Sequence, residues 1–255
     1  MKRSVCIIPA RMGSSRFPGK PLEPLLGLPL VLHVLARCRL YEGFERVVIA
    51  TCDQEIFAAT NAYGGEAVMT GDCHERCTDR VEEAVRKLAL NLDDDDLVVM
   101  IQGDEILVTP EMIDRVVEQH NTSGAPVINL ASRLYRQEDF TSPDTVKVVM
   151  APDNRALYFS RSQIPSDTRG QNAPIYQQTG VMAFTNAFLR HFGEMPQTPL
   201  EIIESVDMMR VLENGLPLDV VRTEMETIGV DTPDDLARAE HILHEDPTTS
   251  CYMDP

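Results

Sequence analysis

Three cations and several small residues follow a short apolar run near the start of the chain. Val5 to Ile8 has the length and composition of a buried strand, and Pro9 ends it. The segment that follows contains Arg11, Gly13, Ser14, Ser15, Arg16, Gly19 and Lys20. A polyphosphate would need such a loop, because backbone amides donate hydrogen bonds to phosphate oxygens and cations balance their charge. The spacing matches neither a P-loop nor G-x-G-x-x-G, so a solvated basic loop is the alternative interpretation of this stretch alone.

Asp104 and Asp231 form a second candidate group. Each follows an expected apolar strand, Val98–Ile101 in one case and Ile228–Val230 in the other. Ligands of open parallel sheets bind beyond the carboxyl ends of strands, so we expect both carboxylates near the basic loop. Two carboxylates there suit a hard divalent cation that also binds triphosphate oxygens. The alternative is structural, with one aspartate capping a turn and the other preceding the last helix; together with the basic loop they favour a Mg²⁺–nucleotide site.

Two other polar groups have plainer interpretations. Cys73, His74 and Cys77 form part of a zinc-binding pattern, but no second pair of ligands follows at a usable spacing. The run Asp93–Asp96 lacks the glycine turn that lets successive carboxylates converge on one ion, so we expect a solvated loop. The six cysteines are scattered along the chain, which is typical of reduced thiols in a cytoplasmic protein.

The composition narrows the class of protein. The chain has 255 residues, of which 43% are hydrophobic and 25% charged, as in an ordinary globular protein of one large α/β domain or two small ones. The net charge of −17 argues against a nucleic-acid partner, because such a surface repels a phosphate backbone. The longest apolar stretch, Pro24 to Leu35, is interrupted by glycine and proline and is too short to cross a bilayer. No signal peptide is expected, since only a short apolar run follows the first cations.

Strand and helix patterns alternate in the first half of the chain. The expected strands are residues 5–8, 46–51, 66–69 and 97–101, and the expected helices lie near 31–38, 55–62 and 78–88. Thr78 is a candidate cap for the third helix, and Thr109 with Pro110 begins a fourth. Several βα units in succession predict a parallel sheet with helices on its faces.

The second half has a different pattern. Strands are expected over 127–134, 145–150, 156–160 and 180–184 without long helices between them. Such mixed strands suggest an added lobe, a place for substrate binding or dimer contact. A helix is predicted over Pro199–Leu212, with Ile202 and Ile203 among its apolar residues.

The last helix has a clear start signal. Thr232 is its expected cap, Pro233 its first residue and Asp235 its third. The helix is expected to run to about residue 243, and the tail from residue 245 to be frayed.

Six separated motifs give a resemblance to a known family. They are I-P-A-R-M-G-S-S-R-F-P-G-K-P-L (8–22), T-D-R (78–80), Q-G-D-E (102–105), F-S-R-S-Q-I-P (159–165), P-L-E-I-I-E-S (199–205) and G-V-D-T-P-D-D-L (229–236). On these motifs the chain resembles the CMP-Kdo synthetases, the 3-deoxy-manno-octulosonate cytidylyltransferases. The sialic-acid-activating relatives differ in the opening loop after I-P-A-R.

This resemblance implies an α/β architecture, the Rossmann-like nucleotide-diphospho-sugar transferase fold. It has a mixed, mostly parallel sheet and an inserted dimerisation or substrate lobe. Residues 1–245 would form one cytidylyltransferase domain, with the nucleotide bound by about 1–125 and 217–245, the lobe at about 126–216, and a tail at 246–255. The resemblance further implies a cytoplasmic homodimer that uses CTP, Mg²⁺ and an acid acceptor, in lipopolysaccharide biosynthesis.

The resemblance also implies a role for each site residue. Those toward the nucleotide would be Ala10, Arg11, Gly13, Ser14, Arg16, Lys20, Arg80 and Gln102. Arg11, Lys20, Asp104 and Asp231 would be catalytic, and the two aspartates would ligate the Mg²⁺. Those toward the sugar acid would be Arg161, Gln178, Met182, Glu201 and Glu204. The implied reaction is attack of the anomeric hydroxyl of a 2-keto sugar acid on the α-phosphorus of CTP, with release of pyrophosphate.

The chain departs from the family pattern mainly at positions that face the sugar. Ile106 replaces the proline after Q-G-D-E, and Cys77 replaces the glycine of S-G-T-D-R. Gln178 and Met182 replace the histidine and first tyrosine of H-I-G-I-Y-A-Y, which contact the sugar in the family. Neutral drift and a different acid acceptor, such as another ulosonic acid or a small phosphonate, both explain the changes, and Arg76 could add a cation for the latter. A non-catalytic nucleotide-binding homologue is a third hypothesis.

Overall fold

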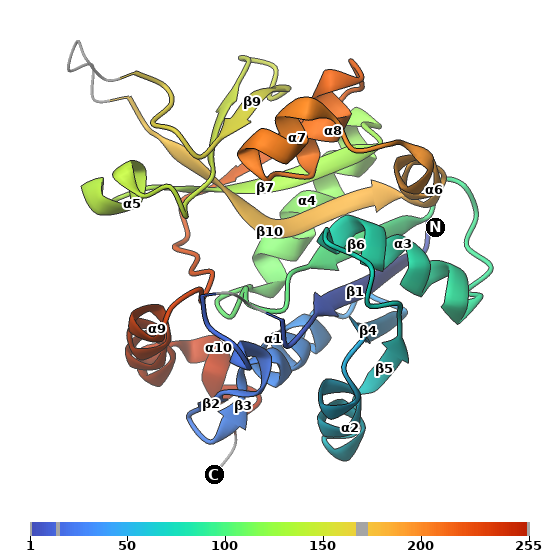
Figure 1. Cartoon of the computed structure of the whole chain (residues 1–255), viewed down its shortest axis with the longest axis vertical. Coiled ribbons are helices and arrows are strands. Elements are labelled where there is room, and N and C mark those ends of the chain that lie inside the picture. The colour runs from blue at the N-terminus through green and yellow to red at the C-terminus, as the bar shows by residue number, and fades with distance from the viewer. Residues whose placement is uncertain (1, 14–15, 167–172, 254–255) are drawn as a thin grey trace.

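A central sheet organises the molecule, with helices on both of its faces (Figure 1). The computed structural model describes residues 2–13, 16–166 and 173–253, so Ser14, one of the predicted nucleotide-binding residues, lies outside the described part. Within these ranges the sheet has nine strands in the order β11-β7-β10-β6-β1-β4-β5, with β8 and β9 attached beside β10.

The first half of the chain supplies the parallel part of the sheet. Its strands are β1 (Ser4–Ala10), β4 (Arg46–Thr51), β5 (Glu66–Met69) and β6 (Leu97–Ile101). Its helices are α1 (Leu30–Arg39), α2 (Gln54–Ala62), α3 (Cys77–Leu88) and α4 (Pro110–Ser123). A short 3-10 helix, Lys20–Leu22, and a hairpin, β2 (Pro24–Leu25) with β3 (Leu28–Pro29), connect β1 to α1. The βα units expected from the hydrophobic pattern are confirmed.

The second half adds antiparallel strands to the same sheet. These are β7 (Val127–Arg133), β8 (Lys147–Met150), β9 (Ala156–Ser160) and β10 (Tyr176–Thr185), followed by β11 (Asp219–Thr223), which is parallel to β7. The helices are α5 (Gln137–Thr141), α6 (Asn186–Glu194), α7 (Pro199–Glu204), α8 (Met208–Glu213), α9 (Pro233–Glu245) and α10 (Pro247–Ser250). Because β10 pairs with β6 on one side and β7 on the other, the expected lobe is continuous with the nucleotide-binding half.

The sheet separates two hydrophobic layers. Along β1, Cys6 and Ile8 pack in the layer of α1 and α4, whereas Val5 and Ile7 pack in the layer of α3 and α6. A strand buried on both faces must be apolar at every position, which explains the continuous apolar run in the sequence. No helix in the described ranges is both long enough and apolar enough to cross a membrane.

Two predicted helix starts are confirmed. The Thr109 hydroxyl accepts the N–H of Met112 at 3.3 Å at the start of α4. The Thr232 hydroxyl accepts the N–H of Asp235 at 3.2 Å, and the Asp235 carboxylate accepts the N–H of Thr232 at 2.9 Å. This capping box fixes the position of the residue just before it, Asp231.

The helix expected over residues 199–212 is broken in the structure. Ser205 takes a left-handed conformation, with φ of +55°, and separates α7 from α8. Ile202 and Ile203 are consequently 58% and 75% exposed, so they do not belong to the core. The helical spacing of apolar residues continues across Ser205, so the sequence pattern gave no sign of the break.

Two local expectations are also wrong. The N-cap of α3 is Arg76, and the hydroxyl of Thr78 instead donates to the carboxylate of Asp207 at 2.6 Å. Ile228–Val230 forms no regular strand; Gly229 makes only an isolated bridge, to the residue after Asp104.

The tail does not fray as expected. Asp246 caps α10, which residues 247–250 form. Arg37 of α1 donates to the Asp246 carboxylate at 2.6 Å. Tyr252 Oη lies 2.9 Å from Nδ1 of His33, so residues up to 253 pack on α1.

The acidic run Asp93–Asp96 is solvated only in part. Its first three residues are at least partly exposed, whereas Asp96 is buried and accepts the N–H groups of Arg3 and Asp93, both at 2.8 Å. Its last carboxylate therefore closes the turn that precedes β6.

Candidate active site

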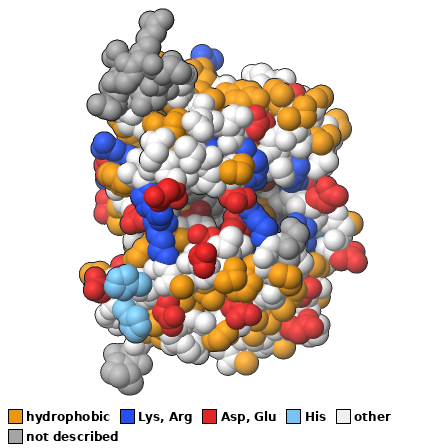
Figure 2. Space-filling view, turned by 60° about the vertical axis from the view of Figure 1, so that its left-hand side comes forward, with side chains coloured by type: hydrophobic (Ala, Val, Ile, Leu, Met, Phe, Trp, Pro, Cys, Tyr) orange, Lys and Arg blue, Asp and Glu red, His pale blue; other side chains and the backbone are white. Residues whose placement is uncertain are grey.

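A polar cavity of about 570 Å³ opens beyond the carboxyl ends of β1 and β6. In the space-filling view it is a hollow with acidic and basic side chains around its mouth (Figure 2). Ten of the predicted site residues line it: Ala10, Arg11, Gly13, Arg16, Lys20, Gln102, Asp104, Arg161, Gln178 and Asp231. The structure thus brings the basic loop and both aspartates to one place, where the parallel sheet was expected to put them.

Lys20 lies between the two aspartates. Its Nζ is 2.7 Å from Oδ2 of Asp104 and 3.2 Å from Oδ1 of Asp231. Gly19 has a φ of +80°, a conformation that favours glycine, and it makes the tight turn before the short helix that begins with Lys20. Burial by itself lowers the pKa of Lys20, but the charges of both aspartates outweigh it and raise this pKa above its usual value. Lys20 is therefore a fixed ammonium that joins the first loop to both carboxylates.

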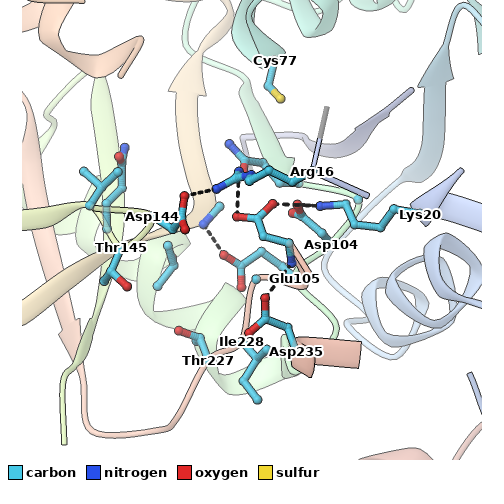
Figure 3. Close-up of a pocket in the computed structure, with 18 of the residues that line it drawn as sticks. Arg16, Lys20, Cys77, Asp104, Glu105, Asp144, Thr145, Thr227, Ile228 and Asp235 are labelled. Carbon is cyan, nitrogen blue, oxygen red and sulfur yellow. Dashed lines mark hydrogen bonds and ion pairs between the residues drawn. The ribbon is translucent and has the colours of Figure 1, made fainter. Parts of the chain in front are cut away.

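Arg16 connects the two sides of the cavity (Figure 3). One guanidinium nitrogen lies 3.0 Å from Oδ2 of Asp231, and the other pairs with Asp144, which lies between α5 and β8. Arg16 and Asp144 are both half-exposed, so this ion pair at the mouth is screened by water and easily exchanged.

Arg11 and Arg80 both hold the segment before α3. Arg11 lines the cavity and donates to the carbonyl of His74 at 3.2 Å. Arg80 is buried outside the lining and donates to the hydroxyl of Thr70 at 2.6 Å and to the carbonyl of Gly71 at 3.0 Å. Arg80, expected toward the nucleotide, does not line the cavity; its side chain holds the loop that Arg11 contacts, and a role toward the nucleotide stays a prediction.

Met182 does not reach the cavity. It is 1% exposed and packs in the layer of α3 and α6, where it pairs with Met100 of β6. The register of β10 shifts between Gln178 and Met182; residues 177–180 line the cavity, whereas Met182, after the shift, does not. Of the two sugar-facing departures, only Gln178 is in a position to meet a ligand.

Glu201 and Glu204 also lie outside the lining. Glu201 is fully buried and accepts two hydrogen bonds from the guanidinium of Arg210, at 2.8 and 2.7 Å. Glu204 accepts the N–H of Arg161 at 2.9 Å and the hydroxyl of Ser160 at the same distance. Here both glutamates hold other residues of the chain, and Glu204 directly positions a cavity residue; their role toward the sugar acid stays a prediction.

Arg161 lines the cavity with most of its donors already used. Its guanidinium donates to the main-chain carbonyls of Pro143, Asp144, Glu204 and Ser205. The buried Lys147 complements it, because its Nζ donates to the carbonyls of residues 142, 145 and 161 at 2.8, 2.7 and 2.6 Å. Two cations thus fix the segment 142–145 along the cavity wall.

Sequence reasoning missed several residues of the wall. Glu105 is buried beside Asp104, and burial raises its pKa to about 7, with the neighbouring aspartates adding to the effect. It belongs to the Q-G-D-E motif, which was the available signal. Asp144 and Lys147 lie in no motif.

Of the residues that depart from the family pattern, some line the cavity and others lie elsewhere in the protein. Cys77 lines the cavity, and burial raises the pKa of its thiol to about 12, so it is neutral. Ile106 is fully buried in the core. Arg76 donates to the hydroxyl of Ser205 at 2.8 Å and does not line the cavity, so it supplies no cation there.

The chain belongs to the cytidylyltransferase family, whose sequence pattern it matches over residues 5–228. It is 42% identical to the 3-deoxy-manno-octulosonate cytidylyltransferase of Syntrophus aciditrophicus, over 95% of this chain and 98% of the relative. It is 38% identical to the 8-amino-3,8-dideoxy-manno-octulosonate cytidylyltransferase of Shewanella baltica strain OS195, over 94% and 98%.

A solved structure is similar over nearly the whole chain. It is the CMP:2-keto-3-deoxy-manno-octonic acid synthetase complexed with CTP, with a TM-score of 0.86 and 32% identity. The similarity covers 96% of this chain and 99% of that one. The predicted fold class and family are confirmed.

Proposed function

We propose that this protein transfers the cytidylyl group of CTP to the anomeric hydroxyl of 3-deoxy-manno-octulosonate or its 8-amino variant. The hydroxyl oxygen forms a bond to the α-phosphorus, the bond from that phosphorus to the bridging oxygen breaks, pyrophosphate leaves, and the hydroxyl proton passes to water. The Lys20–Asp104–Asp231 group carries the proposal, since it lies at the cavity of a chain that matches a CTP-bound synthetase over 96% of its length.

The first loop is suited to hold the triphosphate. Arg11, Arg16 and Lys20 are cations that line the cavity, and a nucleophile approaches the α-phosphorus only when such charges offset those of the phosphates. The side-chain partners of Arg16 and Lys20 here are carboxylates that line the same cavity, so a bound triphosphate exchanges one anion for another. This arrangement keeps the cations in place between turnovers.

Asp104 and Asp231 fit a Mg²⁺ ion. Both carboxylates line the cavity and contact the same ammonium, so they converge on one place. Among the described residues no group of three or more acidic, histidine or cysteine side chains converges, and Mg²⁺ typically takes one or two carboxylates together with substrate phosphates and water. When bound, the ion lowers the pKa of a coordinated hydroxyl and offsets phosphate charge. The protein's own part is to hold the two carboxylates, through the Thr232 cap and the turn after β6.

The test is pyrophosphate release with CTP and a panel of acceptors. We expect turnover with 3-deoxy-manno-octulosonate or its 8-amino variant and none with small phosphonates. Turnover with phosphonates alone would replace the proposed acceptor, and CTP binding without pyrophosphate release for any acid would show a non-catalytic homologue.

We propose further that the protein is a homodimer. Two neighbouring elements expose apolar residues: α7 exposes Ile202 and Ile203, and β9 exposes Leu157. The two elements are in contact, because the hydroxyls of Tyr158 and Ser160 on β9 donate to the carboxylate of Glu204 on α7. Exposed apolar side chains on two neighbouring elements favour association. Light scattering at working concentration tests this, and a monomer there contradicts it.

We also propose that the protein is cytoplasmic. All six cysteines are free, and two of them, Cys6 and Cys38, are buried in the core, as expected for a protein in a reducing compartment. Fractionation of the native cells, with the protein followed by antibody, tests this assignment.

A further inference from the structure

A bulge in β10 forms the part of the cavity wall that adjoins the Q-G-D-E segment, where the carbonyl of Gly180 accepts the N–H of Gln102 at 3.0 Å. Residues 177–180 line the cavity, and the register between β10 and β7 shifts between Gln178 and Met182. Side chains satisfy the backbone groups that the bulge takes out of the sheet: Glu105 accepts the N–H of Gly180, and the Thr179 hydroxyl accepts the N–H of Val181 at 3.2 Å. The bulge is thus a built feature with its polar groups paired.

Asn129 of β7 is the buried centre of this arrangement. Its Nδ2 lies 3.0, 3.1 and 3.3 Å from the carbonyl oxygens of Leu130, Thr179 and Val181. The side chain is fully buried. Turning the amide over would point its oxygen at three carbonyl oxygens in a dry environment, which costs the free energy of buried unpaired groups. The direction of the Asn129 amide is therefore fixed by its surroundings.

The direction of the Gln178 amide follows from that of Asn129. Oδ1 of Asn129 accepts a hydrogen bond from Nε2 of Gln178 at 2.9 Å. If the Gln178 amide were reversed, its Oε1 would face Oδ1 of Asn129, and two acceptors would repel each other. Nε2 therefore faces Asn129 on β7, and Oε1 points away from Asn129. The main chain of Gln178 is held as well, because its N–H donates to the carbonyl of Val146 at 2.8 Å. Since Gln178 lines the cavity and its Nε2 donates one hydrogen to Asn129, Oε1 is the acceptor that this side chain can offer a ligand.

We propose that Asn129 is a positioning residue and Gln178 a specificity-determining residue that accepts a hydrogen bond from the acceptor substrate. The matching chemistry on the substrate is a hydroxyl or amino N–H on the carbon skeleton of the acid. An acid without such a donor leaves the Gln178 oxygen unpaired, and a second anionic group is repelled by it. This inference rests on the proposed function and narrows its acceptor to polyhydroxylated or amino-substituted acids.

The first test is Gln178→Met, which keeps the side-chain length and removes both polar groups. With 3-deoxy-manno-octulosonate as the acceptor, the acceptor KM should rise by about 3- to 10-fold, the effect of one neutral hydrogen bond, whereas the KM for CTP stays unchanged. Gln119→Met is the matched control, because that glutamine lies on α4 and donates to Asp219, outside the cavity lining. An unchanged acceptor KM in Gln178→Met overturns the inference.

Asn129 is tested by a double-mutant cycle. Asn129→Ala should raise the acceptor KM by a similar factor, and the double variant with Gln178→Met should be no worse than either single variant in this KM. Additive losses in KM overturn the positioning role. If Asn129→Ala does not fold, the Gln178 variants alone decide the inference.

Gln178→His gives a sharper test of polarity. A neutral imidazole can donate one N–H to Asn129 and present its other nitrogen as an acceptor, so the acceptor KM at pH 8 should stay within about 3-fold of wild type. Below the ordinary histidine pKa of about 6.5 both nitrogens become donors, and the acceptor KM should rise at pH 5.5 as in Gln178→Met. Glu105, Asp144 and Arg161 line the same cavity, so the readout is the difference between variant and wild-type profiles. An acceptor KM that falls as the pH is lowered overturns the acceptor assignment.

These outcomes are distinct from failure of the proposed function. If the wild-type protein releases no pyrophosphate with any sugar acid, the proposed function and this inference are both overturned. If it turns over sugar acids and the Gln178 variants behave as wild type, only the inference is overturned.

Discussion

Different forces hold the two ends of the cavity, which we propose bind the nucleotide (the nucleotide end) and the acid acceptor (the acceptor end). At the nucleotide end, Arg16 and Lys20 pair with Asp104, Asp231 and Asp144, and every one of these groups is charged. At the acceptor end, Gln178 and Arg161 are fixed by hydrogen bonds to other amides and to main-chain carbonyls.

This difference corresponds to two tasks. The Arg16–Asp144 ion pair at the cavity mouth is half-exposed and exchangeable, so a phosphate can replace this carboxylate at little cost, whereas the buried Lys20 stays fixed. Buried amide networks have one low-energy direction, so the acceptor end presents a fixed pattern of donors and acceptors. We therefore predict that substitutions of charged residues at the nucleotide end alter turnover. Removal of a hydrogen-bonding group at the acceptor end should instead alter acceptor affinity or stability.

The largest expected effect is that of Asp104→Asn. It removes one of the two carboxylates proposed for Mg²⁺, so kcat should fall by about 10²- to 10³-fold, as when one preorganised electrostatic group is lost. The fold should persist, because the side chain is partly exposed and Lys20 keeps Asp231 as a partner. Pyrophosphate release over a Mg²⁺ titration measures the effect. Asp234→Asn, at an exposed position of α9, is the control, and wild-type activity in Asp104→Asn removes that residue from the mechanism.

Lys147→Met is expected to damage the acceptor end through stability. The change leaves three main-chain carbonyls without their buried donor, at a cost of about 2–4 kcal/mol, or roughly 10 °C in Tm. Because this segment also carries the contacts of Arg161, the acceptor KM should rise more than the KM for CTP. Thermal unfolding and both KM values check this, with Arg115→Met, at an exposed ion pair on α4, as the surface control. A Tm equal to that of wild type would show that the carbonyls find other partners.

The nucleotide end could be predicted from the sequence because its residues are close to strand ends along the chain. Lys20 follows the first apolar strand within one loop, and Asp104 comes three residues after β6. Parallel strands place such residues at one edge regardless of the details of packing. The motif carrying Asp231 was likewise informative because its cap, Thr232, is a local feature.

The rest of the site depends on contacts that local patterns do not contain. Arg80 and Glu201 lie in recognised motifs. In the structure, however, Arg80 holds the loop before α3 and Glu201 pairs with Arg210. Met182 lies only four residues from Gln178, and the bulge between them decides which one faces the cavity. Asp144 meets Arg16 across 128 positions of sequence, which only the tertiary fold brings together.

Glu83→Gln should give a smaller effect, which depends on pH. Glu83 accepts the N–H of Gly71 at 2.9 Å and pairs with Lys87 and His74, so it fixes the loop that Arg11 contacts. Burial opposes its ionisation, but these partners prevail and lower its pKa to about 2. An acid with a lowered pKa stabilises the fold above its unfolded-state pKa and loses this contribution as the pH falls. The variant should be about 1–2 kcal/mol less stable at pH 7, and the difference should shrink steadily from pH 5 toward pH 2. A pH-independent difference in unfolding free energy would mean that the charge is not what holds the loop.

The smallest expected effect is that of Asp144→Asn, which tests the exchangeable character of the nucleotide end directly. Asp144 and the triphosphate compete for Arg16, so removing the carboxylate charge should lower the KM for CTP by up to about 3-fold, within the range of an exposed ion pair. Stability should change by less than about 0.5 kcal/mol, since both side chains are half-exposed. The effect should also diminish at high salt, which screens the pair in the wild-type protein. A raised KM for CTP would mean that Asp144 aligns Arg16 for the phosphates, and the nucleotide end would then be as rigid as the acceptor end.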